Sequence, residues 1–219
     1  MTLQTATHTF LGKTFRVIEG RTHGEYSLTC FATEEADFRE QFWKPEPGQV
    51  VVDVGASYGA YTLTAAVLGA DVIAFEPDDA IRADLRRNVE LNGLYSRVSV
   101  RGYGLWDKTD DIDMSSYAPH WPAGTVANKF PMAKLDLFDL PKVDWLKIDV
   151  EGAEAHVLRG AQDTIKRCRP TLIIEVHTFL DAGLMAKCEA ALAATGVEYL
   201  LEEVPRGECV MLVGRAACS

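Results

Sequence analysis

The chain has 219 residues, of which 47% are hydrophobic and 25% are charged, so it can supply both a buried core and a solvated surface. Its 22 basic and 32 acidic residues give a net charge of −10. This composition excludes extended disorder, and the charge disfavours nucleic acid and anionic membranes as partners, because the positive field that phosphates attract is missing.

No run approaches the roughly 20 apolar residues that cross a bilayer. The first ten residues lack the basic start and apolar centre of a secretory leader. The five cysteines are odd in number and show no Cys-x-x-Cys spacing, which argues against a disulfide framework or a zinc ribbon. We therefore expect a cytoplasmic protein without a membrane partner, with reduced thiols at Cys30, Cys168, Cys188, Cys209 and Cys218.

The first 48 residues differ in pattern from the rest of the chain. Two β-like runs, Thr14 to Glu19 and Tyr26 to Phe31, precede a helix-like stretch that ends before Pro45. We expect residues 1–48 to form an N-terminal extension made of a β-hairpin and a helix, and residues 49–219 to form the main domain.

Short apolar runs from Val50 onward predict parallel strands that are covered on both faces. These runs are Val50 to Val54, Val72 to Phe75, Arg97 to Arg101, Trp145 to Val150, and Leu172 to Val176. Apolar residues at helical spacing lie between and after them: Ile81, Leu85 and Val89; Leu158, Ala161 and Ile165; Leu184, Cys188 and Leu192. The alternation of the two patterns predicts an α/β fold with a doubly wound, mostly parallel sheet.

The end of the chain predicts an antiparallel hairpin at the edge of this sheet. Val197 to Val204 and Cys209 to Val213 flank the turn residues Pro-Arg-Gly-Glu. The hairpin makes the sheet seven-stranded, unlike the six parallel strands of the dinucleotide-binding fold. Residues 106–143 form a long connection, which we expect to be an insertion loop that carries substrate contacts.

The segment VVDVGASYGAYTL, residues 51–63, predicts a ligand-binding turn. A strand ends at Asp53, and Gly55 and Gly59 allow a tight turn that brings backbone amides to a ligand at the carboxyl end of the strand. Ser57 occupies the middle position of the Gly-x-Gly-x-x-Gly pattern, which disfavours a pyrophosphate. The turn alone suits ATP, NAD, flavin or adenosylmethionine, and packing glycines give the same pattern.

Two further segments place charged residues at strand ends. Glu76 follows the second strand, where a carboxylate can accept hydrogen bonds from both ribose hydroxyls; the alternative is a charge that favours a helix N-terminus. Lys147 and Asp149 interrupt an apolar strand that leads into the turn Glu151–Gly152. Buried charges are costly, which favours a functional role, although an ion-paired strand end would account for them as well.

These motifs together resemble the FkbM family of S-adenosylmethionine-dependent methyltransferases. The resemblance is carried by VVDVGASYGAYTL, by FEP at 75–77, VRGYGLWD at 100–107, KIDVEGAEAHVLRG at 147–160 and PTLIIEVH at 170–177. It implies a Rossmann-like class I methyltransferase fold and methylation of a small-molecule hydroxyl on a sugar, a polyketide or another natural product. Residues 1–48, as a lid, and the loop 106–143 match the family little, and we expect them to select this acceptor.

The resemblance also assigns the cofactor site. The implied S-adenosylmethionine-binding residues are Asp53, Gly55, Ala56, Tyr58 and Gly59 in the loop, Glu76 and Pro77 at the ribose, Gly104 and Leu105 beside the adenine, and Asp149 near the methionine amine. Ser57 stands where the family often carries Asn.

A hydroxyl acceptor must lose its proton, and three residues are candidates for that step. Glu175 and His177 are two apart on the fifth strand, so both point to one face, and Asp149 ends the neighbouring strand. We expect His177 to be the base, because an imidazole pKa near 6.5 suits proton transfer at neutral pH, unless it is a satisfied loop histidine. Alternatively, Asp149, Glu175 and His177 bind a divalent metal that acidifies the hydroxyl.

Several alternatives stay open at this point. A nucleotide-dependent oxidoreductase also uses a glycine turn and a ribose-binding acid, although the missing middle glycine and the hairpin count against it. Methylation of nitrogen or of RNA on the same fold, and an adenosine-binding module without catalysis, are further alternatives.

His23 and His120 are candidates for the acceptor pocket, while His156 is expected to pack on a helix. The oligomeric state is open, and a homodimer is compatible with the sequence.

Overall fold

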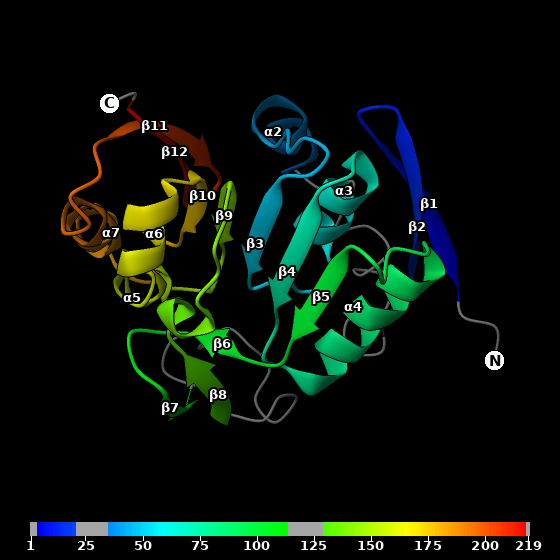
Figure 1. The fold of residues 1–219 in the computed structure, drawn as a ribbon, viewed down its shortest axis with the longest axis horizontal. Coiled ribbons are helices and arrows are strands. Elements are labelled where there is room, and N and C mark those ends of the chain that lie inside the picture. The colour runs from blue at the N-terminus through cyan, green and yellow to red at the C-terminus, as the bar shows by residue number, and fades with distance from the viewer. Residues whose placement is uncertain (1–3, 21–34, 114–128, 218–219) are drawn as a thin grey trace. The chain divides into compact units, whose positions relative to one another are not determined.

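A seven-stranded β-sheet has the strand order β11-β12-β10-β9-β3-β4-β5 in the computed structural model (Figure 1). The structure describes residues 4–20, 35–113 and 129–217. The chain falls into two units, residues 1–102 and 103–219. The division at residue 48 between an extension and a main domain stays a prediction. The strands of the sheet are mostly parallel, as predicted, and the α/β fold class is confirmed.

The first unit contributes three parallel strands, β3 (Val50–Val54), β4 (Asp71–Phe75) and β5 (Val98–Arg101). The helices α3 (Ala60–Leu68) and α4 (Asp79–Leu91) follow β3 and β4. The carboxylate of Asp78 accepts hydrogen bonds of 2.8 Å from the amides of Ala80 and Ile81. Asp78 therefore caps α4 and accounts for the start of the helix at the predicted place.

The N-terminal segment forms a hairpin with a different partner from the one expected. The strand β2 (Lys13–Ile18) matches the prediction, but it pairs with β1 (Thr5–Phe10), while Tyr26 to Phe31 lies outside the described residues. The two-residue turn has positive φ at both Leu11 and Gly12, as type I′ hairpins require. The strand β1 was not predicted because four of its six residues are polar and three of these, Thr5, Thr7 and Thr9, are exposed.

Two asparagines of α4 attach this hairpin to the rest of the first unit. Asn88 accepts a hydrogen bond of 2.8 Å from the amide of Ile18, and the side chain of Asn92 bonds both the amide and the carbonyl of Arg16 at 2.7 Å. The helix α2 (Glu35–Phe42) lies where the sequence predicted it. That residues 1–48 cover an acceptor stays a prediction.

The second unit contributes the parallel pair β9 (Trp145–Ile148) and β10 (Thr171–Val176) and the antiparallel hairpin β11 (Tyr199–Arg206) and β12 (Cys209–Ala216). The hairpin strands are longer than predicted, since Pro205 is paired with Val210 and the turn is reduced to Gly207 and Glu208. Proline is tolerated there because β11 is the last strand in the order and therefore an edge strand.

One predicted helix is divided into two. The stripe of Leu158, Ala161 and Ile165 suggested a continuous helix, but α5 (Glu154–Arg159) ends at Gly160 and α6 (Gln162–Cys168) begins anew. A Cβ atom at Gly160 would lie 1.9 Å from the carbonyl oxygen of Trp106. The helix is divided because the backbone at Trp106 lies so close to Gly160. No local sequence pattern indicates this contact. The helix α7 (Leu184–Ala193) agrees with the prediction.

Part of the expected loop 106–143 is ordered as a small sheet. The strands β7 (Asp110–Asp113) and β8 (Lys129–Ala133) join β6 (Gly104–Leu105) in the order β6-β8-β7, and a 3-10 helix covers Leu135–Phe138 (Figure 1). The side chains of Trp106, Phe130 and Met132 are buried together, so this sheet has its own apolar cluster.

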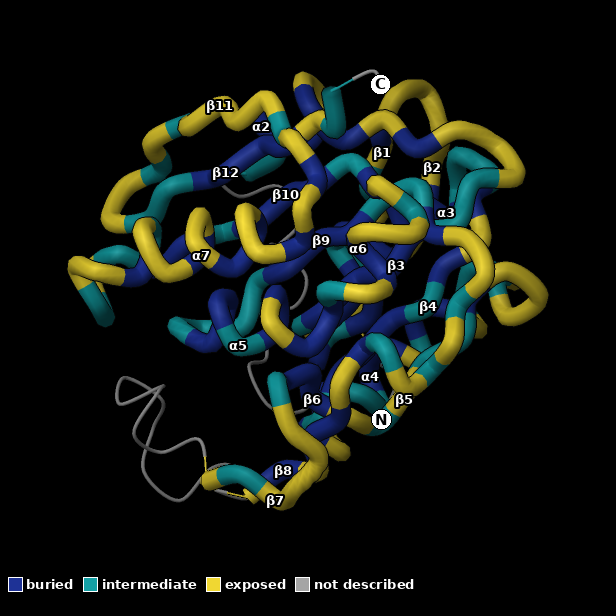
Figure 2. The backbone as a smooth tube through the Cα atoms, turned by 60° about the vertical axis from the view of Figure 1, so that its left-hand side comes forward, coloured by how far each residue is buried: buried dark blue, intermediate teal, exposed yellow. Residues whose placement is uncertain are grey.

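Buried residues concentrate in the central strands, as the dark segments of β3, β9 and β10 show in Figure 2. Val51, Val52, Leu146 and Ile148 are completely buried. This burial is the reason that the strands read as nearly continuous apolar runs. Among the described residues, no helix has the length and apolarity that a bilayer crossing requires.

Candidate functional site

The glycine turn after β3 has the geometry that its sequence predicted. Gly55, Ser57 and Gly59 have φ values of 73°, 49° and 99°. The amides of Gly55 and Ala56 both donate to the carbonyl oxygen of Phe75 at 3.0 Å, which fixes the turn against the end of β4. A Cβ atom at Gly59 would lie 2.7 Å from Leu85 Cδ1, so a glycine is needed there for space as well as for φ.

Glu76 is locked beside this turn by the backbone. The residue is 7% exposed; Oε2 accepts a hydrogen bond of 2.9 Å from the amide of Ser57, and Oε1 accepts one of 3.0 Å from the amide of Asp78. A carboxylate oxygen has two lone pairs and can accept more than one hydrogen bond, so both oxygens suit ligand hydroxyls. The capping residue of α4 is Asp78 and not Glu76, so the carboxylate of Glu76 is not used to bond the first turn of the helix.

The remaining loop residues face the protein interior. Asp53 is 1% exposed, and its Oδ2 accepts a 2.6 Å hydrogen bond from Thr62 Oγ1 on α3. Ala56 and Tyr58 are also buried, and the carbonyl of Tyr58 accepts a 3.0 Å hydrogen bond from Asn88 Nδ2. The side chains of Ala56 and Tyr58 therefore support the turn, which offers a ligand its main chain.

Sequence reasoning did not select Thr62 or Asn88. In the sequence, Asn88 is recognisable only as a polar residue next to Val89, which belongs to the apolar stripe of α4. Pro77, predicted at the ribose, directly follows Glu76, and Arg82 Nη1 donates to its carbonyl at 2.8 Å.

In the second unit, Gly104 and Leu105 are buried in β6, paired with Met132 and Ala133. The next residue, Trp106, stacks on His156 with ring centroids 4.0 Å apart and an angle of 18° between the planes. His156 thus has the packing role that its place on a helix suggested. That Gly104 and Leu105 contact adenine stays a prediction.

An acidic side chain holds this stack in place. Asp107 Oδ2 lies 2.9 Å from His156 Nδ1 and accepts a 2.8 Å hydrogen bond from Arg159 Nε. Burial raises the pKa of Asp107, but the hydrogen bonds from Arg159 and His156 outweigh it, and the pKa is lowered. Burial lowers the pKa of His156, so its ring is neutral at pH 7.

The catalytic candidates of the second unit gather around His177. The imidazole is 5% exposed, and its Nδ1 lies 2.7 Å from Glu154 Oε1. Its Nε2 lies 3.4 Å from Glu151 Oε2 and 3.8 Å from Asp149 Oδ1. Glu154 is completely buried and also accepts a 3.0 Å hydrogen bond from the amide of Gly152. The structure therefore joins Asp149 and His177 as expected and adds Glu151 and Glu154.

The charge state of His177 differs from the one expected. Burial lowers the pKa of the imidazole, but the hydrogen bond to Glu154 and the charges of Asp149, Glu154 and Glu151 more than offset it and raise the pKa to about 9. His177 is then a cation at neutral pH. A cationic imidazole cannot accept a proton, so the expected role as a base requires the loss of this proton first.

Two groups of side chains have the spacing of metal ligands. The ligand atoms of Asp149, Glu151 and His177 lie within 4.8 Å of one another, and so do those of Glu175, His177 and Cys209. Among the described residues, the predicted trio of Asp149, Glu175 and His177 does not form such a group. Burial, together with the charge and hydrogen bond of Glu175, raises the pKa of the Cys209 thiol to about 12, so this sulfur stays protonated. His23 and His120 lie outside the described residues.

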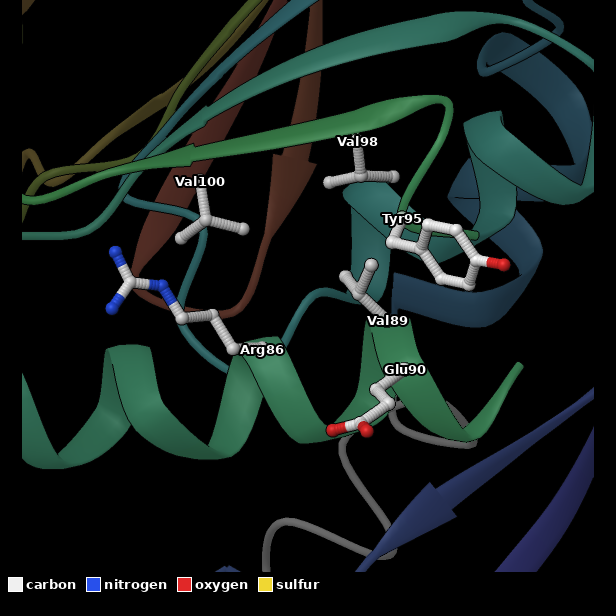
Figure 3. A pocket seen from close by; sticks show the side chains of 6 residues that line it. All are labelled: Arg86, Val89, Glu90, Tyr95, Val98 and Val100. Atoms are coloured by element: carbon white, nitrogen blue, oxygen red, sulfur yellow. The ribbon is translucent and has the colours of Figure 1, made fainter. Parts of the chain in front are cut away.

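A surface cavity of about 350 Å³ lies elsewhere in the first unit, between α4 and β5. Figure 3 shows its lining residues, Arg86, Val89, Glu90, Tyr95, Val98 and Val100. None of them belongs to the predicted site, and they supply one basic and one acidic group among apolar atoms. This cavity therefore shares no lining residue with the turn after β3.

Comparisons with known proteins agree with the architecture. "Methyltransferase 1" of Beauveria bassiana (strain ARSEF 2860) is 29% identical over an alignment of 147 positions, and the match covers 52% of this chain and 58% of that protein. The crystal structure of methyltransferase FkbM from Methylobacillus flagellatus KT has a TM-score of 0.58 at 18% identity, and the match covers 86% of this chain and 52% of that one. P. horikoshii TYW2 in complex with MeSAdo has a TM-score of 0.51 at 16% identity, covering 98% and 71%.

These two first relatives are longer, and the chain spans little more than half the length of each. The family model of the methyltransferase FkbM domain matches residues 53–191, which include the glycine turn, Glu76 and the cluster around His177. The chain therefore belongs to the FkbM family of methyltransferases.

Proposed function

We propose that the protein transfers the methyl group of S-adenosylmethionine to a hydroxyl group of a small molecule. The carrying observation is Glu76, whose two carboxylate oxygens are fixed by backbone amides at the end of β4, where both can accept hydrogen bonds from ribose hydroxyls. The MeSAdo bound by TYW2 supports an adenosyl ligand on this fold. The net charge of −10 favours a neutral or cationic acceptor over RNA.

The cofactor itself supplies an electrophilic methyl group when it is bound. The residues that would hold it in the first unit are the turn from Asp53 to Gly59, whose glycines allow a close approach to the main chain, and Glu76, through its carboxylate. The turn is already formed without a ligand, because the amides of Gly55 and Ala56 are bonded to Phe75. The binding free energy is then not spent on ordering the loop.

We propose that the carboxylate of Glu175 takes the proton that the methyl-accepting hydroxyl loses. His177 carries a proton at neutral pH, and Asp149 Oδ2 already contacts Lys147 Nζ at 3.2 Å. Glu175, in β10, lies in one group with His177, which directly follows this strand, so an acceptor hydroxyl at this group can reach a carboxylate and a cation together. The cation would stabilise the alkoxide that develops as Glu175 takes the proton.

Isothermal titration with S-adenosylmethionine and with NAD tests the first step. We expect binding of S-adenosylmethionine and none of NAD, and the reverse result would contradict the proposal in favour of an oxidoreductase. Formation of S-adenosylhomocysteine with a library of hydroxylated small molecules tests the second step. Loss of turnover in Glu175→Gln by a factor of about 10² or more, with unchanged cofactor affinity, is the expected result for a proton acceptor.

A further inference from the structure

The group of Asp149, Glu151 and His177 is more than an ion-paired strand end. We propose that it binds a divalent transition-metal cation such as Mn²⁺, with His177 Nε2, Glu151 Oε2 and Asp149 Oδ1 as the protein ligands. The binding of the cation does not depend on the proposed function. Only its use rests on that function: the cation displaces the Nε2 proton of His177 and would take over from the imidazolium the stabilisation of the alkoxide.

The spacing of the three atoms fits ligands better than hydrogen-bond partners. The distances of 3.4 Å and 3.8 Å from His177 Nε2 exceed the 2.7–3.2 Å of an N–H···O hydrogen bond. Ligand bonds of about 2.0–2.2 Å at octahedral or tetrahedral angles place neighbouring ligand atoms roughly 3.0–3.6 Å apart. The 3.4 Å to Glu151 Oε2 lies within this range, and the 3.8 Å to Asp149 Oδ1 exceeds it by a few tenths of an ångström.

Glu154 orients the imidazole in the way that metal-binding histidines are commonly oriented. Its Oε1 lies 2.7 Å from His177 Nδ1, which directs Nε2 to the two carboxylates. Glu154 is completely buried, and among the described residues its Oε2 has no hydrogen-bond partner. A buried carboxylate with one unbonded oxygen needs a nearby positive charge. A divalent cation bound at His177 Nε2 would supply that charge in place of the imidazole proton, which it displaces.

The two carboxylates leave this group open on one side. The side chains of Asp149 and Glu151 are 27% and 32% exposed, whereas that of His177 is 5% exposed. Asp149 contacts Lys147 through Oδ2, so that Oδ1 faces His177. A bound cation would therefore have positions left for water or for a hydroxyl. One imidazole with two carboxylates suits Mn²⁺ or Zn²⁺ better than Ca²⁺, which prefers oxygen alone.

The test measures Mn²⁺ binding by electron paramagnetic resonance on the full chain, without a histidine tag and after treatment with a chelator. The titration is done near pH 8, where the imidazole proton competes less. We expect one Mn²⁺ per chain and at least tenfold weaker binding in Asp149→Asn and in Glu151→Gln. Glu154→Gln, which alters no ligand, should weaken binding by about 10- to 100-fold. Glu202→Gln, at an exposed carboxylate on β11, is the control and should bind normally.

A second signal identifies the nitrogen ligand. Electron spin-echo envelope modulation of the Mn²⁺ complex should show a ¹⁴N coupling that disappears in His177→Gln. Circular dichroism of each variant checks that the fold is retained. Absence of saturable binding, or equal binding by wild type, Asp149→Asn and Glu151→Gln, would overturn the cation site and leave an imidazolium paired with carboxylates.

The outcomes for the two proposals are separate. Mn²⁺ binding by a chain that does not turn over S-adenosylmethionine with any acceptor would support the cation site and contradict the proposed function. Full turnover after metal removal, together with no Mn²⁺ binding, would overturn the cation site and support the proposed function.

Discussion

The side-chain amide of Asn88 on α4 donates a hydrogen bond of 3.0 Å to the main-chain carbonyl of Tyr58 in the glycine turn. The same side chain accepts a hydrogen bond from the amide of Ile18 in β2. One completely buried residue thus connects the N-terminal hairpin, a helix and the turn to which the cofactor is assigned.

Replacement of Asn88 by Ala should both destabilise the protein and weaken cofactor binding. Two buried backbone groups lose their partner, which costs about 2–4 kcal/mol. Urea unfolding and calorimetric titration with S-adenosylmethionine measure the two effects. Asn92→Ala is the matched control, because Asn92 bonds the same hairpin but not the turn. We expect it to lower stability by about 1 kcal/mol and to leave the affinity unchanged; equal affinities of both variants would contradict this role of Asn88.

Replacement of Glu76 by Ala should weaken the binding of S-adenosylmethionine by about 1.5–3 kcal/mol, the scale of a hydrogen bond to a charged group. The amides of Ser57 and Asp78 also lose their acceptor, so the turn loosens. Calorimetric titration gives the affinity, and Glu90→Ala on the exposed side of α4 serves as the control. An unchanged affinity in Glu76→Ala would show that the ribose is bound elsewhere.

Replacement of Gly160 by Ala should destabilise the second unit, because the new Cβ would lie 1.9 Å from the carbonyl oxygen of Trp106. Backbone atoms must move to accept it, at a cost of about 1–3 kcal/mol. Gly183→Ala is the control, since its Cβ would meet only the side chain of Asp181 at 3.3 Å and the flexible end of Lys187. Thermal unfolding should separate the two variants, and equal midpoints would contradict a close contact at Gly160.

The stability of the metal-free protein should fall as the pH rises through the pKa of His177. The pKa is about 9 in the folded state and near 6.5 in the unfolded state, so the folded protein holds the proton more tightly. The contribution is complete below pH 6.5 and is lost between pH 6.5 and about 9, with a size of roughly 3 kcal/mol. Urea unfolding at several pH values, with a chelator present, measures this loss.

His177→Gln is the comparison that isolates this effect, because it retains every other titrating group. The difference in unfolding free energy between wild type and variant should shrink as the pH increases. If the difference in unfolding free energy is constant from pH 6 to pH 9.5, the imidazole has the same pKa in the folded and the unfolded state.

The sequence predicted those elements whose pattern follows from burial on both faces. The strand β3 was placed at its observed bounds, because its side chains are buried almost without interruption. The glycine turn was equally readable, since glycine is the residue that most easily adopts a positive φ, and Glu76 was readable as a charge at the end of an apolar strand. The strand β1 was missed because its residues alternate between exposed and partly buried polar side chains.

The cluster around His177 was only partly predictable. The spacing of Glu175 and His177 predicted that the two side chains share a face, although β10 ends one residue before His177, at Val176. Nothing local indicated that Glu151 turns toward His177. That direction depends on a φ of 56° at Glu151, a conformation that glutamate rarely adopts. The charge of the imidazole depends on Glu154, which lies on α5 and is brought close only by folding. The base role predicted from an ordinary pKa therefore could not anticipate the cation.

The bond between the amide of Ser57 and Glu76 has a consequence for motion as well as for binding. An amide that is already bonded to a buried carboxylate exchanges its hydrogen slowly, and Ser57 should be protected from solvent deuterium before any ligand arrives. The turn then enters binding as a rigid receptor, and arrival of the cofactor would change its exchange rate little. The turn would therefore select its ligand by a shape that it already has before the ligand binds.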